Sequence, residues 1–409
     1  MQEKLIGLAG IVVLIGIAIA FSTNRRAINL RIVAAAFAVQ VVIAALVLYV
    51  DAGRAAIDWF SGGVLAVIDY SREGINFMFG PLANTEVIGF SFAINVLPIV
   101  IFFSALMSVM YHLRIMEYLV RIVGGFLHRV IGTGTIESMN AAANIFVGQT
   151  EAPLVVKPYL KSLTEPQLFA VMCSGVASIA GTVLAGYVGL GAQIEYLLAA
   201  SFMAAPGGLL MAKLLMPDES AASGGPEKLT MERSQAPNVI MAAGNGASDG
   251  LRLAVNIGAM LVAFVGLIAL FNGVVGGLFG LVGVEGITLQ LILGKLFQPL
   301  MWLLSIPWAE AEVAGSLFGQ KVILNEFVAF LDFANVKESL SPRSAAIITF
   351  SLCGFANLSS IAILLGGLGV LVPEKRDLIG KYGLRAVLAG SLSNLMSAAL
   401  AGLMLPAVM

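Results

Sequence analysis

Long apolar stretches without charged residues recur along the chain, and eight of them approach the length of a membrane crossing. A helix needs about 20 predominantly apolar residues to cross the hydrocarbon core of a bilayer. The eight stretches comprise residues 5–24, 32–50, 87–111, 168–190, 196–212, 253–284, 345–372 and 386–404. Two of them, 253–284 and 345–372, are too long for an upright helix and are rich in Gly, Asn and Ser, so we expect tilted or broken helices there. The pattern predicts an all-α polytopic membrane protein with eight transmembrane helices.

Composition supports this interpretation and excludes a water-soluble protein. Of the 409 residues, 59% are hydrophobic and 11% are charged, and the mean hydropathy is +0.96. Soluble domains average about 25% charged residues. The net charge of −1 provides no basic field for nucleic acid. The first apolar stretch is followed by Arg25 and Arg26 rather than by a small-residue cleavage site, so we interpret it as a retained span and not as a signal peptide.

The placement of lysine and arginine predicts the topology, because cytoplasmic loops carry an excess of both residues. Three basic clusters fall on one side of the membrane if the N-terminus lies outside. They are Arg25, Arg26 and Arg31 after the first span; Arg114, Arg121 and Arg129 after the third; and Lys375, Arg376, Lys381 and Arg385 before the last. We therefore expect both termini on the extracytoplasmic side.

Two amphipathic segments and one polar segment lie between the spans. Residues 54–79 and 112–131 mix apolar and charged side chains, and we expect helices that lie in the membrane interface. Residues 217–250 contain a Ser-Gly-Gly-Pro string and scattered charges, which predicts an exposed cytoplasmic loop. Its glycine-rich end, residues 244–250, is expected to be a loop that leads into the sixth span.

A duplication is the most informative feature of the sequence. One copy extends from about residue 140 to 191, and the other from about 314 to 369. Each copy begins with a short apolar segment that carries a glutamate and continues through a proline-containing turn into a full span. The matching strings are Gly-Gln-Thr-Glu at 148–151 with Leu-Asn-Glu-Phe at 324–327, and Cys-Ser-Gly-Val-Ala-Ser at 173–178 with Cys-Gly-Phe-Ala-Asn at 353–357. Apolar segments of 10–14 residues are too short to cross a bilayer and are typical of re-entrant hairpins.

The predicted topology inserts the two hairpins from opposite sides, which makes the repeats inverted. Inverted repeats with broken helices are typical of secondary transporters, in which substrate and ion bind between the halves near the bilayer midplane. A duplication without a site at its centre is the alternative. The expected division is scaffold spans and interfacial helices in 1–135, a hairpin with a broken span in 136–191, scaffold spans in 192–310, a second hairpin with a broken span in 311–372, and a cytoplasmic loop with the last span in 373–409.

Glu151 and Glu326 occupy equivalent positions of the two repeats in apolar surroundings. A carboxylate at the centre of a membrane helix costs about 3 kcal/mol on insertion scales, so we expect both to face a polar cavity. As ligand groups they would accept hydrogen bonds from hydroxyl or ring N–H donors. The alternative is that each lies at a hairpin tip and is merely hydrated. Intramembrane catalysis by a carboxylate pair is disfavoured because no nucleophile, base or metal set accompanies the pair.

Uncharged polar side chains gather near the same break points. They are Gln149, Thr150, Asn357, Ser359 and Ser360. Such donors and acceptors suit a neutral solute that forms many hydrogen bonds, whereas an anion would require Arg or Lys. The alternative is hydrogen bonding between packed helices, which we favour for Ser359.

A second cluster has the oxygen atoms that a monovalent cation needs. Asn144 and Ser178 offer side-chain oxygens, and Val147 just before Gly148 could offer a freed backbone carbonyl, with Ile179 beside them. Ordinary packing is the alternative for this cluster. Cys173 and Cys353 lie in apolar stretches and are interpreted as small packed residues without a disulfide or zinc role.

The strings at 148–154 (Gly-Gln-Thr-Glu-Ala-Pro-Leu), 325–329 (Asn-Glu-Phe-Val-Ala) and 353–360 (Cys-Gly-Phe-Ala-Asn-Leu-Ser-Ser) resemble those of the concentrative nucleoside transporter family. The likeness extends over nearly the whole chain, including residues 244–250. The resemblance implies eight spans, two opposed re-entrant hairpins, a homotrimer and a location in the bacterial inner membrane. It implies sodium-coupled symport of nucleosides such as uridine into the cell by alternating access, with an elevator-like movement of the hairpin repeats and without an organic cofactor.

Roles of individual residues also follow from the resemblance. Gly148, Gln149, Thr150, Glu151 and Val183 would lie against the nucleobase; Glu326, Asn357 and Ser360 would bind the ribose hydroxyls beside Phe355; and Asn144, Val147, Ser178 and Ile179 would form the sodium site. The complete match at the sodium site favours sodium over proton coupling, and a proton-coupled nucleoside symporter is the nearest alternative. A passive channel is a further alternative.

Overall fold

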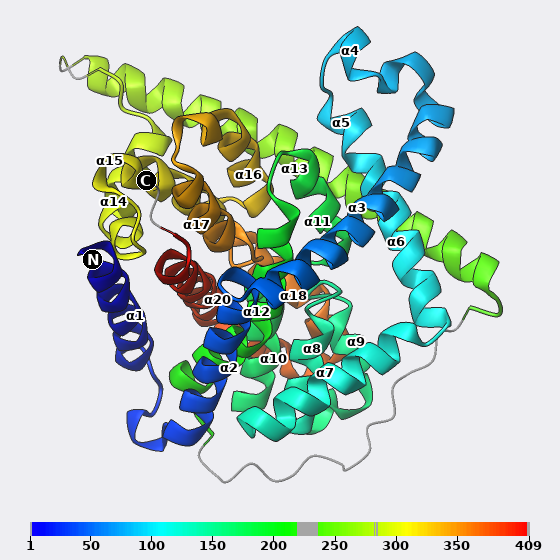
Figure 1. Ribbon diagram of the computed structural model, residues 1–409, viewed down its shortest axis with the longest axis vertical. Helices are drawn as coiled ribbons and strands as arrows, with labels where there is room; N and C mark the ends of the chain where they lie inside the picture. Colours follow the sequence, from blue (N-terminus) through cyan, green and yellow to red (C-terminus); the bar gives the residue numbers. More distant parts are fainter. Residues whose placement is uncertain (1, 219–235, 282, 284, 407–409) are drawn as a thin grey trace.

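The computed structural model describes residues 2–218, 236–281, 283 and 285–406, and these residues form an all-helical fold (Figure 1). The helices of the first half are α1 (Gln2–Ala20), α2 (Leu30–Leu48), α3 (Asp51–Phe79), α4 (Thr85–Ile88), α5 (Phe92–Asn95), α6 (Leu97–His112), α7 (Ile115–Ile131), α8 (Thr135–Ala143), α9 (Ala152–Val155), α10 (Glu165–Ala177), α11 (Gly181–Gly189) and α12 (Ile194–Leu215). Those of the second half are α13 (Val239–Gly280), α14 (Leu289–Leu303), α15 (Trp308–Ile323), α16 (Glu326–Val336), α17 (Pro342–Leu352), α18 (Ser359–Gly366), α19 (Leu368–Leu371) and α20 (Arg376–Met404). The prediction of an all-α fold is confirmed.

Several helices have the length and apolar character of membrane spans. Among the described residues six qualify: Leu30–Leu48, Phe92–His112, Glu165–Gly189, Ile194–Leu215, Val239–Gly280 and Pro373–Met404. A seventh candidate is the pair α14 and α15, which is bent by 118°. The predicted spans 5–24 and 345–372 contain the shorter apolar helices Lys4–Ala20 and Ser359–Leu371. A polytopic membrane protein is therefore supported, whereas the count of eight spans stays a prediction.

Both segments that were predicted to be amphipathic helices are helical. Residues 54–79 lie within α3, where Trp59 is 80% and Phe77 95% exposed. Residues 112–131 correspond mainly to α7, which ends at the left-handed Gly132. Large apolar side chains that are exposed on a helix fit contact with lipid. The position of both helices in the interface stays a prediction.

The predicted loop 217–250 is wrong over its last twelve residues. Residues 219–235 lie outside the described part of the chain, but α13 begins at Val239, where the Asn238 side chain accepts a hydrogen bond from the Met241 amide at 2.8 Å. The glycines that suggested a loop are packing positions in a helix. A Cβ atom at Gly246 would lie 2.5 Å from the Ser104 carbonyl oxygen, and one at Gly250 would lie 2.7 Å from the Ser104 Cβ. This Gly-x-x-x-Gly spacing lets two helix backbones approach closely.

The same helix bears on a second expectation. The stretch 253–284 is expected to be tilted or broken; α13 is continuous through it as far as Gly280, so it is not broken, and its tilt stays a prediction. The stretch 345–372 is broken as expected, because α17 ends at Leu352 and α18 begins at Ser359. The stretch 168–190 is also broken, between α10 and α11.

We expect Gly246→Leu to destabilise the protein by about 1–3 kcal/mol, because the added side chain would overlap the backbone of α6. Gly244→Leu is the matched control, since nothing lies within 4 Å of a Cβ atom at Gly244 in the same helix. Thermal unfolding of both purified variants in one detergent measures the difference. Equal unfolding midpoints for the two variants would contradict the close contact between α6 and α13.

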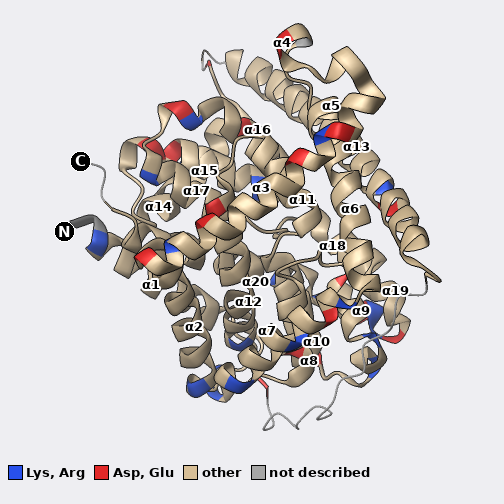
Figure 2. Ribbon diagram, turned by 45° about the vertical axis from the view of Figure 1, so that its right-hand side comes forward, with Lys and Arg blue, Asp and Glu red and all other residues tan. Residues whose placement is uncertain are grey.

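The two sequence repeats form similar units around one central helix. In the first, α8 and α9 precede the broken pair α10 and α11, and in the second, α15 and α16 precede the broken pair α17 and α18. Helix α20 packs against both α10 and α17 (Figure 1). The breaks of both repeats are therefore brought to the middle of the fold. Figure 2 shows basic residues gathered at the end of the molecule that holds the connection between α1 and α2 and helix α7. The topology itself stays a prediction.

Candidate functional site

Each repeat interrupts its helices at two places, and these breaks contact one another. Interrupted helices leave backbone N–H and C=O groups without intrahelical partners. The Phe355 amide donates to the Ser178 carbonyl at 3.0 Å, which connects the break of α17 to the break of α10. The Gly181 amide donates to the Phe146 carbonyl at 3.1 Å, within the first repeat. The freed backbone groups of one broken helix thus satisfy those of another.

Glu326 is buried and accepts hydrogen bonds from both repeats. It is the first residue of α16, whose N-cap Asn325 accepts from the Val328 amide at 2.9 Å. Its side chain is buried, with 4% of the residue exposed. The Tyr187 hydroxyl donates to Oε1 at 3.1 Å, and Asn357 Nδ2 donates to Oε2 at 2.9 Å. The start of a helix favours a negative charge, so the fold provides several compensations for a buried carboxylate.

Three further polar residues extend this group toward the first repeat. Asn357 Oδ1 accepts from the Ser360 amide at 2.9 Å, and Gln149 Nε2 donates to Ser360 Oγ at 3.2 Å. Gln149 Oε1 is buried and has no partner in the described structure. Ser360 Oγ also donates to the carbonyl of Phe355, whose side chain is partly buried. The structure therefore unites Gln149 with Glu326, Asn357 and Ser360, and leaves a buried acceptor to be satisfied by a ligand.

Ser359, which we had expected to form hydrogen bonds between helices, donates instead to Asn357 Oδ1 at 2.7 Å. This contact lies inside the same break and orients the Asn357 amide. Thr150 crosses to the second repeat, because a Cβ atom at Gly367 would lie 2.9 Å from Thr150 Cγ2. Both residues thus support the arrangement of the two breaks.

Glu151 has different surroundings from Glu326. It is exposed and lines a cavity of about 630 Å³ together with Val147, Gly148 and residues of α6, α7 and α13. Glu326 does not line this cavity. A Cβ atom at Gly148 would lie 2.7 Å from Glu151 Oε2, so a larger residue there would displace the carboxylate from its present position. The expectation that the two carboxylates share one water-accessible pocket is therefore not met by this cavity; in the described part of the chain a hydrogen bond between their neighbours Gln149 and Ser360 connects the two repeats.

Tyr187 is a site residue that the sequence did not reveal. It is fully buried in α11, donates to Glu326, and stacks on Phe330 with ring centroids 4.5 Å apart. Val183, which was predicted, is 2% exposed and precedes Tyr187 by four residues. Residues four apart lie on one face of a helix. The four-residue spacing from Val183 could therefore have indicated that Tyr187 faces the same site.

The predicted cation ligands lie where the first hairpin meets the end of α10. Asn144, Val147, Ser178 and Ile179 are all buried. Asn144 Nδ2 donates to the Asn140 carbonyl at 2.9 Å, whereas Asn144 Oδ1 has no partner among the described residues. A Cβ atom at Gly175 would lie 3.9 Å from this oxygen, and Ser178 Oγ bonds the Gly175 carbonyl at 3.3 Å. A buried amide oxygen without a partner, beside a helix end, fits a monovalent cation.

Two buried lysines are a second feature that sequence reasoning missed. Lys213 Nζ lies 2.5 Å from Glu137 Oε1 and 2.7 Å from Asp218 Oδ2. Lys321 Nζ bonds the Ser351 carbonyl at 3.1 Å and Asn394 Oδ1 at 2.6 Å. Cys173 and Cys353 are buried and free, in agreement with a packing role. In the described part of the chain no group of His, Cys, Asp and Glu could hold a metal ion with three or more such ligands.

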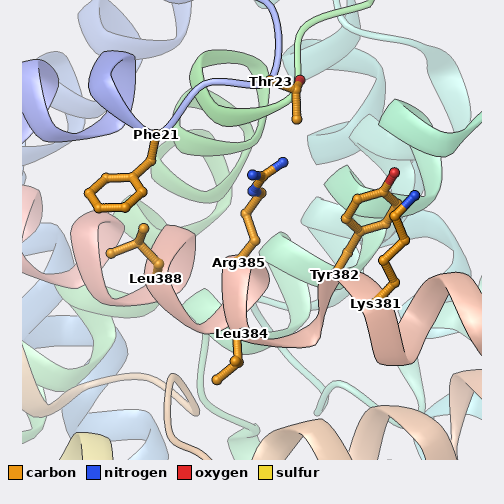
Figure 3. A pocket seen from close by; sticks show the side chains of 7 residues that line it. All are labelled: Phe21, Thr23, Lys381, Tyr382, Leu384, Arg385 and Leu388. Atoms are coloured by element: carbon orange, nitrogen blue, oxygen red, sulfur yellow. The ribbon is translucent and has the colours of Figure 1, made fainter.

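A separate cavity of about 590 Å³ contains none of the predicted site residues. It lies between the end of α1 and helix α20, and Figure 3 shows Arg385 extending toward Thr23 across it. Its walls comprise Phe21, Thr23, Lys381, Tyr382, Leu384, Arg385 and Leu388. Two of the basic clusters that defined the predicted topology are therefore side by side.

Models of protein families match nearly the whole chain. The model described as "Na+ dependent nucleoside transporter N-terminus" matches residues 9–82, the one described as "Nucleoside recognition" matches 93–194, and "Na+ dependent nucleoside transporter C-terminus" matches 196–402.

Individual relatives agree with these models. The chain is 51% identical to the nucleoside permease NupC of Helicobacter pylori, over 98% of each protein. It is 36% identical to the sodium/nucleoside cotransporter 1 of Oryctolagus cuniculus, over 98% of this chain and 63% of that protein. Among solved structures, CNTnw in an inward-facing substrate-bound state is 52% identical, with a TM-score of 0.94 over 98% of each chain. A CNTnw variant in an outward-facing state has a TM-score of 0.93 and 51% identity, over 99% of this chain and 98% of that one.

Proposed function

Since this chain belongs to the family of sodium-dependent nucleoside transporters, and is a transporter rather than an enzyme, we propose that it carries nucleosides into the cell together with sodium ions. Relatives in this family have been solved in inward-facing and outward-facing states. Alternating access is therefore the mechanism of the family's solved members. Sodium coupling, the moving parts and the roles of individual residues are proposed for this chain.

The observation that carries the proposal is the hydrogen-bonded group formed by Gln149 of the first repeat with Glu326, Asn357 and Ser360 of the second. A nucleoside is neutral and offers ribose hydroxyl donors and a base with both donors and acceptors. In the proposal the ribose hydroxyls donate to the Glu326 carboxylate and bond Asn357 and Ser360. Charge-assisted hydrogen bonds of this kind contribute about 1.5–3 kcal/mol each.

The base is assigned to the first repeat. The buried Gln149 Oε1 would accept from the base, with Thr150 and Glu151 on the same segment and Gly148 allowing close approach. Val183 and Phe355 would supply apolar contacts to the base and the sugar. No arginine is among these residues, which fits a solute without charge.

Sodium is assigned to Asn144, Val147, Ser178 and Ile179. The unpartnered Asn144 oxygen next to the end of α10 supports this assignment. An ion at this place would bring together the hairpin and the broken span of the first repeat. Its binding would thus order the segment that carries Gln149.

Sodium coupling provides enough free energy to concentrate a neutral solute. One charge that moves through 100 mV contributes about 2.3 kcal/mol, and a tenfold sodium gradient adds about 1.4 kcal/mol. Together these terms support a gradient of several hundred-fold for a nucleoside carried with one sodium ion.

The moving unit is assigned to the two hairpins with their broken spans. Hydrogen bonds connect the two repeats, from Phe355 to Ser178 and from Gln149 to Ser360, so the repeats would move together. Helices α6 and α13 would belong to the stationary scaffold. The exposed apolar side chains of α13, such as Val262 at 79% and Leu270 at 63%, suit contact with lipid or with further copies in a homotrimer.

The proposed location is the inner membrane of a bacterium, with eight spans, opposed re-entrant hairpins in an inverted repeat and both termini outside. The basic residues at one end of the molecule support this orientation (Figure 2). A cysteine introduced near either terminus should react with an impermeant thiol reagent on intact spheroplasts, and labelling only after lysis would reverse the topology.

Uptake of labelled uridine into proteoliposomes tests the function. We expect accumulation when an inward sodium gradient is imposed and none when sodium is equal on both sides. A proton gradient alone should have no effect. Accumulation that follows pH instead of sodium would establish the alternative, a proton-coupled symporter, and equilibration without accumulation would indicate a channel.

We expect Asn144→Ala to raise the sodium concentration for half-maximal uptake at least tenfold, because it removes the unpartnered amide oxygen. Uridine uptake at saturating sodium should be affected less. Ser174→Ala is a matched control, since Ser174 is a buried polar residue of α10 that bonds Asn140 and is not an assigned ligand. An unchanged sodium dependence of Asn144→Ala would place the ion elsewhere.

A further inference from the structure

Lys321 is a fully buried cation without a carboxylate partner among the described residues. It lies in α15, three residues from the break that precedes Glu326, and it is 0% exposed. Its ammonium group is held by the Ser351 carbonyl, by Asn394 Oδ1 and by the face of the Phe318 ring, whose centroid is 5.5 Å away. Burying a charge is costly unless dipoles or an opposite charge compensate it. Here carbonyl and amide oxygens compensate it, as they do for a bound metal cation.

Asn394 extends this contact to both repeats. It is buried in the middle of α20, and its Nδ2 atom donates to the Ala177 carbonyl at 2.7 Å and to the Cys353 carbonyl at 2.9 Å. Ala177 is the last residue of α10, and Cys353 directly follows the end of α17. The C-terminal ends of helices carry partial negative charge. One lysine and one asparagine thus lie at the negative ends of both broken helices.

The surrounding space leaves little freedom for these groups. A Cβ atom at Gly354 would lie 2.6 Å from Asn394 Nδ2 and 2.7 Å from the Ala177 carbonyl oxygen. The next residue, Phe355, bonds Ser178, and Asn357 bonds Glu326. The Lys321–Asn394 pair therefore contacts the start of segment 353–358, which carries Asn357 to Glu326.

The two repeats carry different polar groups near the end of their first helix, α8 or α15. Asn144 directly follows the first helix of its repeat, α8, seven residues before Glu151, and its amide oxygen has no partner among the described residues. Lys321 lies near the end of the corresponding helix, α15, five residues before Glu326. Near this helix end the first repeat thus has a buried oxygen, and the second repeat has a buried lysine.

We propose that Lys321, through Asn394, positions the breaks of α10 and α17 for nucleoside binding. The inference rests on the proposed function, because nucleoside binding is its readout. Lys321 and Asn394 are positioning residues that act through Asn357 and Glu326.

Binding of uridine to the purified protein in detergent with sodium chloride tests the proposal. Lys321→Met removes the charge and keeps an unbranched apolar side chain. We expect it to weaken uridine binding at least tenfold, whereas Lys321→Arg should recover part of this loss. Ser393→Ala is the matched control, because Ser393 is the neighbouring buried residue of α20 and its hydroxyl has no partner.

Asn394→Asp keeps the proposal testable if Lys321→Met does not fold. The substitution conserves size and the contact to Lys321, but it replaces the two N–H donors by an oxygen that faces the Ala177 and Cys353 carbonyls. We expect a loss of uridine affinity of at least tenfold. Wild-type affinity in either folded variant would overturn the proposal.

Thermal unfolding of the same variants separates positioning from general stability. If Lys321 served stability alone, the variants would unfold at lower temperature while the folded protein kept its dissociation constant for uridine, and this result would also overturn the proposal. Failure of the wild-type protein and of Ser393→Ala to bind uridine would instead contradict the proposed function. The two failures are thus distinguishable.

Discussion

Glu326→Gln is expected to reduce uridine uptake roughly hundredfold while the protein stays folded. The wild-type carboxylate is buried at the start of α16 and accepts hydrogen bonds from Tyr187 and Asn357. Glutamine has nearly the same shape but carries no charge and exposes an N–H₂ group to donors. Replacing two charge-assisted bonds to ribose by neutral ones loses about 1.5 kcal/mol each, or about 3 kcal/mol in all, which corresponds to a factor of this size.

Initial rates of uridine uptake into proteoliposomes measure this effect at several uridine concentrations. Glu338→Gln makes the same chemical change at an exposed position of the same repeat and should transport normally. Size-exclusion chromatography establishes that both variants have the same assembly. Near-normal uptake by Glu326→Gln would remove Glu326 from ribose binding.

Lys213→Met is expected to destabilise the protein by about 3–5 kcal/mol, the cost of leaving a buried carboxylate without its partner. The side chains of Lys213 and Glu137 are 3% and 1% exposed, and Glu137 Oε2 also accepts from the Gly134 amide at 2.8 Å. This pair attaches the start of α8, and hence the first hairpin, to the end of α12. Its loss should lower the yield and the thermal midpoint more than it alters the affinity for uridine.

The double variant Lys213→Met with Glu137→Gln provides the control. It removes both buried charges, so most of the lost stability should return, because a buried ion pair often contributes little relative to neutral groups. The second partner of Lys213, Asp218, is 19% exposed and can be hydrated. Thermal unfolding in detergent compares wild type, single variant and double variant. A double variant no more stable than Lys213→Met would show that the charge of Glu137 is not the cause.

The position of the breaks could be predicted from the sequence because the repeats mark them twice. Short apolar segments ending at Glu151 and Glu326, each followed by a proline turn and a Cys and Gly string, correspond to observed interruptions. Family resemblance assigned Gln149, Asn357 and Ser360 to one site, and the structure brings these residues together.

Partners that are distant in sequence could not be predicted in the same way. Lys213 pairs with Glu137, which is 76 residues away, and Lys321 pairs with Asn394, which is 73 residues away. The pattern of apolar residues predicts that these lysines lie near the ends of spans or hairpins. It does not predict which residues they contact. The structural role of Gly246 and Gly250 could not be predicted for a related reason. Glycine occurs both in loops and where two helices pack closely, and only the position of Ser104 in the structure distinguishes the two.

The unbroken course of α13 predicts that transport depends on the thickness of the bilayer. At about 1.5 Å per residue, its 42 residues form a rod of about 63 Å, roughly twice the thickness of the hydrocarbon core. Such a rod adjusts to membranes of different acyl-chain length by changing its inclination. Helix α6 packs closely against α13 at Gly246 and Gly250, so a change in the inclination of α13 would also move α6. We therefore expect uridine uptake to vary with the acyl-chain length of the phospholipids used for reconstitution.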